Sequence, residues 1–269
     1  MTQAPSRVIV TVRDVRGADE LRACQELQRK AWGITEDGYV VPVATMAAAQ
    51  RVGGLILGAF DASQSLVGFA FAFLGKVQGR LVLWSQLTGV HPAHQSTGVG
   101  RMLKFEQRRR AKQMGLEAVA WAFDPLQASN AAFNLGVLGA TCSIYELDMY
   151  GSRSDALNVG LATDRLVAEW STAGEPGGRT TAWPDGHDLI ETREGDVARV
   201  VPIDPERNHV HVEVPPRLND LRNRGASALS DWQSALREAF QTAFGAGFVA
   251  VGFSRADPAH PRYLLERAR

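Results

Sequence analysis

The fold is decided by one stretch of the chain, Val90-His91-Pro92-Ala93-His94-Gln95-Ser96-Thr97-Gly98-Val99-Gly100. An apolar run from Leu81 precedes it, and apolar residues at helical spacing follow it from Val99 to about Met114. We therefore predict a strand, a glycine-bearing turn and a helix. The first N–H groups of such a helix have no partner inside it, so they point at whatever lies above the turn.

The turn has the composition of an anion-binding site. Gly98 and Gly100 lack the Cβ atoms that would hold a phosphate away from the backbone. The helix dipole adds roughly 0.3–1 kcal/mol in the same direction. No Gly-Lys-Ser/Thr follows, and Leu103 stands where a dinucleotide-binding turn has its third glycine, so neither of those motifs fits. We expect a diphosphate as the ligand. The alternative is that the glycines are there only for the backbone conformation of the turn.

The hexapeptide from Gln95 to Gly100 resembles motif A of the GNAT acyl-CoA N-acyltransferase superfamily, in which V-x-P is followed by Q/R-x-x-G-x-G/A. The resemblance implies acetyl-CoA or another acyl-CoA as co-substrate, with no metal. It also implies that backbone amides of the turn hold the coenzyme's pyrophosphate and that the strand before it pairs with the pantetheine arm. The coenzyme-binding residues would be Leu87, Gly89, Val90, Gln95, Ser96, Thr97, Gly98, Val99, Gly100 and Arg101.

Four further motifs are similar to a subgroup of the GNAT superfamily. They are W-x-F-D-P-L at 121–126, N-A-x-F-N at 130–134, Tyr150-Gly151, and D-R-x-x-x-E-W at 164–170. Most members are known only as predicted acetyltransferases, and some resemble N-succinyltransferases for amino acids. By this resemblance Asn130 and Phe133 join the coenzyme site.

Composition narrows the class of protein. The 269 residues carry 29 Lys+Arg and 29 Asp+Glu, so the net charge favours neither nucleic acid nor an acidic membrane as partner. The basic run at 108–112 is expected to be a solvated helix face or a contact for the coenzyme's 3′-phosphate. Cys24 and Cys142 match no metal or disulfide spacing. No export signal or membrane-spanning run is present, so we expect a cytoplasmic protein.

The order of predicted elements is β, α, α, β, β, β, α, β, α, β up to about Gly151, which is the arrangement of a GNAT domain. We predict an α+β fold with a mixed sheet, in which residues 1–172 form the GNAT domain, 173–187 a linker or loop, and 188–269 a β-rich unit with one long helix. Predicted strands include 7–13, 55–60, 66–74, 81–90, 117–123, 144–150, 189–192, 198–203 and 209–214, of which 55–60, 66–74 and 81–90 are expected to form an antiparallel meander. Predicted helices include 127–138 and 230–244, the second capped by Ser230, and Asp14 or Asp19 is expected to cap the helix after the first strand.

The C-terminal unit is open to two interpretations. Gly247–Val251 and Asp257-Pro258 repeat the positions of Gly115–Val119 and Asp124-Pro125 after a long helix, which suggests a degenerate second GNAT-like unit. An unrelated β-rich cap is the alternative. Exposed strand edges make a homodimer plausible.

Acyl transfer requires a neutral amine and a proton for the leaving thiolate. Many GNAT members place a glutamate on the strand before motif A, yet residues 81–88 contain no carboxylate. The candidate bases are Asp124, His91, and Glu36 or Asp37, although His91 fits a solvated loop and Asp124 fits a helix cap equally well. An α-amine costs only about 1.4 kcal/mol to deprotonate near pH 7, against roughly 4 for a lysine amine, so the missing glutamate favours an acceptor of low amine pKa.

The general acid is also missing from its usual place, because Leu135 stands where many members have a tyrosine. Asn130 and Asn134 can hydrogen-bond the pantetheine amide or the acyl group, and the thiolate would rely on water, Tyr145 or Tyr150. We expect mostly aromatic side chains to line the acceptor pocket and an arginine to bind the carboxylate of the acceptor. The alternatives are that the pocket-lining residues only pack in the core and that the arginine is solvated. These residues are Trp32, Tyr39, Val41, Trp84, Trp121, Phe133 and Arg165.

These features favour an N-acyltransferase that moves an acetyl or succinyl group to the amine of a small metabolite, such as an amino acid. The alternative is a CoA-binding regulatory or interaction module with weak or no turnover, which the missing glutamate and tyrosine would suit.

Overall fold

The computed structural model describes residues 9–151, 161–178, 184–193 and 196–268. They pack as two compact units. The first contains the described residues up to Trp121 together with Ser171–Ala173, and the second contains the remaining described residues from Ala122 onward. The domain limits at 172 and 187 stay a prediction.

The first unit is built on a mixed sheet whose strand order is β1-β2-β3-β4-β5. The pairs from β1 to β4 are antiparallel and β4 pairs with β5 in parallel, so the predicted meander and the predicted α+β class are confirmed. The strands are β1 (Thr11–Asp14), β2 (Leu55–Phe60), β3 (Leu66–Val77), β4 (Arg80–Val90) and β5 (Ala118–Phe123).

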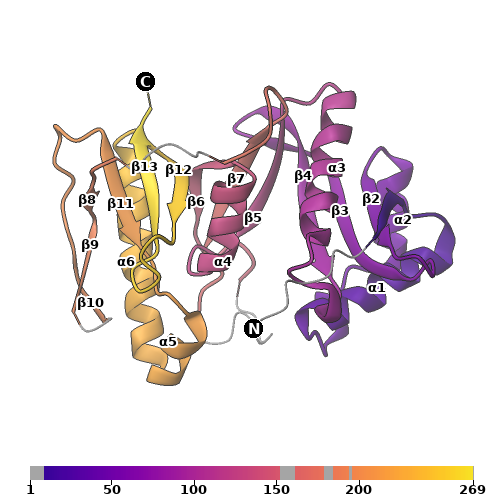
Figure 1. The fold of residues 1–269 in the computed structure, drawn as a ribbon, viewed down its shortest axis with the longest axis horizontal. Coiled ribbons are helices and arrows are strands. Elements are labelled where there is room, and N and C mark those ends of the chain that lie inside the picture. The colour runs from indigo at the N-terminus through magenta and orange to yellow at the C-terminus, as the bar shows by residue number, and fades with distance from the viewer. Residues whose placement is uncertain (1–8, 152–160, 179–183, 194–195, 269) are drawn as a thin grey trace. The chain divides into compact units, whose positions relative to one another are not determined.

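Helices cover both faces of this sheet. The helical elements are α1 (Gly17–Trp32), η1 (Asp37–Tyr39), α2 (Val43–Arg51), η2 (Pro92–His94) and α3 (Val99–Gln113). On one face α1 and α2 pack on Phe69 and Phe71. On the other, α3 lies along β3 and β4 (Figure 1), so closely that a Cβ on Gly68 would stand 2.7 Å from Val99. The glycine turn therefore enters a helix that is fixed against the sheet.

The second unit contains its own run of strands, in the order β7-β6-β12-β13-β11-β8, and a separate hairpin of β9 and β10. Within the described parts of this run, β8 and β11 pair in parallel and the other neighbouring strands pair antiparallel. The strands are β6 (Thr141–Glu146), β7 (Arg165–Ser171), β8 (His187–Asp188), β9 (Ile190–Arg193), β10 (Asp196–Val200), β11 (His209–Glu213), β12 (Phe248–Ser254) and β13 (Arg262–Arg267).

An aromatic cluster holds the second unit together. The Tyr263 ring lies edge-on to Phe240 and Phe253, with centroids 5.1 and 4.8 Å away. Phe240 belongs to the long helix of the unit, whose helical elements are α4 (Ala128–Ala131), the π-helix η3 (Ala132–Val137), α5 (Leu218–Arg224) and α6 (Ala226–Gly245). Both cysteines are buried as free thiols, Cys24 in the first unit and Cys142 in the second.

Several predicted boundaries are wrong for identifiable reasons. The long helix α6 begins at Ala226 and not at Ser230, because Ala226–Leu229 are good helix formers that extend it by one turn. The α1 helix begins after Arg16, whose N–H donates to Glu20, while Asp14 pairs with Arg110 instead of capping. Residues 7 and 8 of the predicted first strand lie outside the described residues.

Other elements were not predicted or have a different form. Strand β7 occupies the D-R-x-x-x-E-W motif, and α5 precedes α6. The strand predicted at 144–150 lies at Thr141–Glu146 and ends before Asp148, whose φ is 42°. The helix predicted at 127–138 is one α-turn followed by a π-helix, which hydrophobic spacing does not reveal.

Candidate acyl-CoA site

The turn ahead of α3 leaves a row of backbone donors unused. The N–H groups up to Gln95 have protein acceptors: His91 donates to the Val67 carbonyl at 2.9 Å, and Gln95 donates to the Pro92 carbonyl at 3.3 Å. The Met102 N–H donates to the Gly98 carbonyl at 3.0 Å. Between them, the N–H groups of residues 96–101 have no acceptor within the described parts of the chain. Six consecutive donors at a helix N-terminus suit an anion with several oxygens.

The backbone of this turn needs its glycines, and the space above it is open. Gly98 has φ 93° and caps α3, and Ser96 has φ 63°. A Cβ on Gly98 would meet no atom within 4 Å, and one on Gly100 would meet only Val90, at 3.7 Å. The protein itself therefore leaves room at Gly100 for a side chain, and that room is available to a ligand.

Polar side chains of the turn hold its shape. The Thr97 hydroxyl donates to the His94 carbonyl at 2.6 Å, and the Gln95 amide donates to the Val90 carbonyl at 3.3 Å. The His91 Nδ1 atom accepts from the Ala93 N–H at 3.3 Å. His91, predicted as a catalytic candidate, thus caps η2 through Nδ1, which leaves its Nε2 as the nitrogen for proton exchange.

Strand β4 has an open edge next to this turn. Its parallel pairing with β5 is confined to Leu83 with Val119 and Trp84 with Ala120 among the described residues. A β-bulge at Gln86 follows at once, since Ala72 pairs with Ser85 and Phe71 with Leu87. Bulges bend a strand and often lie beside active sites. The backbone from Ser85 to Val90 is therefore bonded to β3 on one side and available on the other, which suits an extended amide-containing arm.

A buried lysine lies where β4 and β5 stop pairing, and the sequence interpretation missed it. Lys104 on α3 is 5% exposed. Its Nζ donates to the Ser85 hydroxyl at 2.9 Å and stands 3.7 Å from the centroid of the Trp121 ring. A signal existed in the sequence, because Lys104 and Gln107 share the helical face of Leu103 and Ala111 at spacings of three and four residues.

The basic residues at 108–112 mainly form hydrogen bonds and ion pairs within the first unit. Arg108 donates to the Ser171 carbonyl at 2.7 Å, Arg109 pairs with Glu106 at 2.6 Å, and Arg110 pairs with Asp14 at 2.8 Å. These contacts support a structural role for the three arginines.

The predicted acceptor-pocket residues of the first unit lie on both faces of the sheet. Trp32 packs edge-on against Phe69 in the core under α1, at 6.1 Å between centroids. Trp84 donates to the Gln86 side chain at 2.9 Å. Trp121 contacts Lys104 on the α3 side, and Tyr39 is half-buried in η1. Trp32 and Trp121 therefore lie on different faces of the sheet.

In the second unit, Asp124 forms the turn that begins α4. Its Oδ1 accepts the Leu126 N–H at 2.9 Å, and its carbonyl accepts the Gln127 N–H at 3.1 Å. The N-cap of α4 is Gln127, without a side-chain cap, so Asp124 holds the turn ahead of the helix and does not cap it as predicted. Burial raises the pKa of Asp124, partly offset by the Leu126 hydrogen bond and by the charges of Arg165 and Arg222. A carboxyl with a raised pKa is a better proton acceptor, so the role of Asp124 in this turn and a catalytic role are compatible.

The D-R motif of the second unit forms a buried network. Asp164 has a fully buried side chain that accepts from Arg237 at 2.9 and 3.1 Å and from the Tyr145 hydroxyl at 3.0 Å. Arg165 donates to the Asp164 carbonyl at 2.7 Å and lies 5.6 Å from the Tyr150 ring. Burial and the Asp164 carboxylate raise the pKa of Tyr145 far above its usual value, so Tyr145 is a poor proton donor to a thiolate.

The N-A-x-F-N motif spans α4 and the π-helix. Asn134 is buried in the π-helix, Asn130 is exposed and Phe133 is half-buried. Leu135 is fully buried, so a core side chain stands at the position where the sequence resemblance would place a tyrosine. π-helices are frequent at functional sites because their extra residue re-aims neighbouring side chains.

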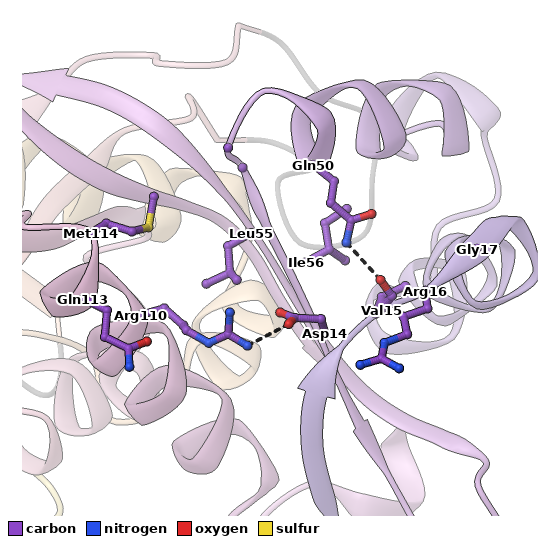
Figure 2. Close-up of a pocket in the computed structure, with 12 residues that line it drawn as sticks. Asp14, Val15, Arg16, Gly17, Gln50, Leu55, Ile56, Arg110, Gln113 and Met114 are labelled. Carbon is purple, nitrogen blue, oxygen red and sulfur yellow. Dashed lines mark hydrogen bonds and ion pairs between the residues drawn. The ribbon is translucent and has the colours of Figure 1, made fainter.

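The first unit also has a pocket that lies away from the glycine turn. Figure 2 shows a pocket of about 600 Å³ between the β1–α1 link, the start of β2 and the last turn of α3. Arg110 pairs there with Asp14, and the Gln50 amide donates to the Val15 carbonyl at 2.9 Å. The pocket is lined by Arg110 and Gln113 of α3 and by Met114 directly after it, about 20 Å along the helix from the turn at 1.5 Å per residue. We therefore place the candidate site at the turn.

Two features are absent from the described residues. No group of three or more His, Cys, Asp or Glu side chains is placed to hold a metal ion. No helix in the described ranges is long and apolar enough to cross a bilayer.

Comparison with known proteins gives structural likeness only. No family model matches the chain, and no curated protein matches it. The solved structures similar to it include the ribosomal-protein-S18-alanine N-acetyltransferase from Escherichia coli, at 15% identity and TM-score 0.47, covering 65% of this chain and 100% of that one. Another is the IAA acetyltransferase from Bacillus cereus, at 15% identity and TM-score 0.45, covering 61% and 99%. At these values the likeness does not assign an activity.

Proposed function

We propose that the chain is an acyl-CoA-dependent N-acyltransferase. The observation that carries the proposal is the row of six unpaired N–H groups at residues 96–101, beside a glycine that leaves space above it. The resemblance of Gln95–Gly100 to GNAT motif A supports the same ligand. The diphosphate of coenzyme A would bind at this row, and its pantetheine arm would lie along the open edge of β4, at Leu87, Gly89 and Val90.

The acyl group is acetyl or succinyl, and the acceptor is the amine of a small metabolite such as an amino acid. The amine attacks the thioester directly in a ternary complex. Asp124 and His91 are the proposed proton acceptors, and Asn134 is the proposed hydrogen-bond partner of the acyl group. Asn130 and Phe133 would contact the coenzyme, and Trp32, Tyr39, Trp84, Trp121 and Arg165 would contact the acceptor.

The test measures thiol release and coenzyme binding separately. The full chain is incubated with acetyl-CoA or succinyl-CoA and a panel of L- and D-amino acids, and free thiol is followed. Calorimetry then compares CoA binding in wild type, Gly100→Ala and Gly100→Asp. The methyl group of Gly100→Ala is in ordinary contact with Val90, so the fold should persist while CoA affinity falls by at least tenfold. The carboxylate of Gly100→Asp should abolish binding.

Gly245→Asp is the matched control, since a Cβ at Gly245 meets no atom within 4 Å and this residue lies at the end of α6 in the second unit. It should leave CoA affinity unchanged. If Gly100→Asp binds CoA as tightly as wild type, the site is misplaced and the proposal is wrong.

The second candidate is a CoA-binding module without turnover. Two observations favour it: residues 81–88 carry no carboxylate, and Leu135 is buried where the family tyrosine stands. CoA binding with no thiol release from any donor and acceptor pair would establish the module.

A further inference from the structure

The point where β4 and β5 stop pairing contains a buried cation. Ser85 and Trp121 are the residues directly after the last pair, Trp84 with Ala120, and both contact Nζ of Lys104. A buried ammonium normally has a carboxylate partner, because its desolvation is costly. The polar groups that face Nζ from β4, β5 and α3 are Ser85, Trp121 and Gln107, none of them charged. No carboxylate in the described residues lies within 4.0 Å of it.

The surroundings of Lys104 have a surplus of donors. The Ser85 hydroxyl accepts from Lys104 and donates to Oε1 of Gln107 at 3.0 Å. Gln107 is completely buried, and its Nε2 has no partner within the described part of the chain. Unsatisfied buried donors cost about 1–3 kcal/mol each, so such a cluster suits an acceptor brought by a ligand. Burial lowers the pKa of Lys104 to about 7, where a side chain can both hold and release a proton.

The distance between Lys104 and the glycine turn suits the coenzyme. Ser85 lies five residues before Val90 on β4, about 16 Å away in an extended strand. The pantetheine arm spans a dozen bonds from phosphate to sulfur, about 15 Å at the extension per bond of a peptide chain. An arm that starts at the unpaired amides and follows the open edge of β4 therefore ends close to Ser85 and Lys104.

We propose that Lys104 is the catalytic residue that protonates the leaving thiolate, a role that rests on the proposed function. The amine nitrogen bonds to the carbonyl carbon, and the C–S bond breaks with its electron pair on sulfur. The sulfur takes a proton from Nζ of Lys104, which becomes neutral. The proton of the attacking nitrogen passes to the base and from it to solvent, and solvent returns one proton to Lys104, so both groups regain their starting protonation state. Lys104 thus supplies the acid that Leu135 does not.

The first test is kinetic. Lys104→Met keeps the length and apolar stem of the side chain and removes its proton. We expect kcat to fall by about 10²–10⁴-fold, with the Kd for CoA within threefold of wild type and the limb of the kcat–pH profile near pH 7 lost. Lys76→Met, on an exposed position of β3, is the control and should change none of these values. Lys104→Gln retains a donor for Ser85 and should lose activity as Lys104→Met does. If Lys104→Met does not fold, Lys104→Gln is the variant that tests whether activity requires Lys104.

The second test does not require turnover. The thiolate of bound CoA is titrated by its ultraviolet absorption. An ammonium in contact with the sulfur lowers the pKa of the bound thiol, so this pKa should rise by at least one unit in Lys104→Met. An unchanged thiol pKa, or a kcat within threefold of wild type in both variants, would overturn the role of Lys104. If wild type releases no thiol from any substrate pair, the proposed function fails instead, and the titration still reports whether Lys104 touches the sulfur.

Discussion

The lowered pKa of Lys104 leads to a prediction about the stability of the fold that does not depend on any ligand. Its pKa is lowered from 10.5 to about 7, so between these values the unfolded chain binds more protons than the folded one, and stability rises with pH. Below pH 7 the full penalty remains, on the order of 5 kcal/mol at 1.36 kcal/mol per pKa unit. Lys104→Met should therefore be more stable than wild type in urea unfolding at pH 7, with the difference shrinking toward pH 10. A methionine variant that is less stable at pH 7 would contradict this account.

Asp124 is a second residue whose two roles can be separated. Asparagine can accept the Leu126 N–H as aspartate does, whereas alanine cannot. Asp124→Ala should lose about 1 kcal/mol of stability, and Asp124→Asn should lose little. If Asp124 is the base, both variants should lose thiol release by about 100-fold or more. Full activity in Asp124→Asn would leave Asp124 with its structural role in the turn alone.

At the scale of elements, the bulge of β4 is what frees its edge. Ser85 and Leu87 pair with consecutive residues of β3, so Gln86 is the extra residue. Deleting Gln86 should restore a regular ladder without moving the side chains of Ser85 or Leu87 to the other face of the sheet. We expect the fold to persist by circular dichroism and CoA affinity to fall at least tenfold in calorimetry. Deleting Val251, the extra residue of the β12 bulge, is the control and should leave affinity unchanged.

The elements differ in how far the sequence predicted them. The spacing of Gly98 and Gly100 was sufficient for the turn and for α3, because φ-positive glycine and helical periodicity are local signals. The bulge at Gln86 was not predicted, because Leu81–Trp84 are all apolar and Ser85 and Gln86 are both polar, so β4 has no alternation in which a shift of one residue would show. Lys104 was missed because charged residues on a helix are usually solvated, although its position on the buried face of α3 was readable.

At the scale of the molecule, the two units also differ in how far the sequence predicts them. The meander and α3 of the first unit follow from short-range patterns. The second unit depends on long-range contacts such as Asp164 with Arg237, which are 73 residues apart and carry no local signal. The repeat suggested by Asp257-Pro258 stays a prediction. Asp257 does form the same turn as Asp124, accepting the Ala259 N–H at 2.9 Å, but β12 pairs antiparallel where β5 pairs parallel.

The Asp164 network predicts where the second unit is most sensitive to mutation. Its carboxylate joins β6, β7, α6 and the turn at Asp148, whose N–H donates to it at 3.0 Å. Asp164→Asn removes the charge that faces Arg237. Because Arg237 is 38% exposed, the loss should be about 2 kcal/mol and not the 3–5 of a fully buried pair. Glu191→Gln, which breaks the exposed pair with Arg199, should give no measurable change in urea unfolding. Equal effects of the two substitutions would contradict the assignment.

The two buried cysteines have a practical consequence for any search for substrates. Cys24 is 0% and Cys142 1% exposed, and burial raises the pKa of Cys24 to about 12. A chromogenic disulfide reagent should therefore find no reactive sulfur on the native protein, so the colour it develops counts coenzyme molecules alone. A slow signal that levels off at two equivalents per chain would instead report enzyme denaturing in the cuvette.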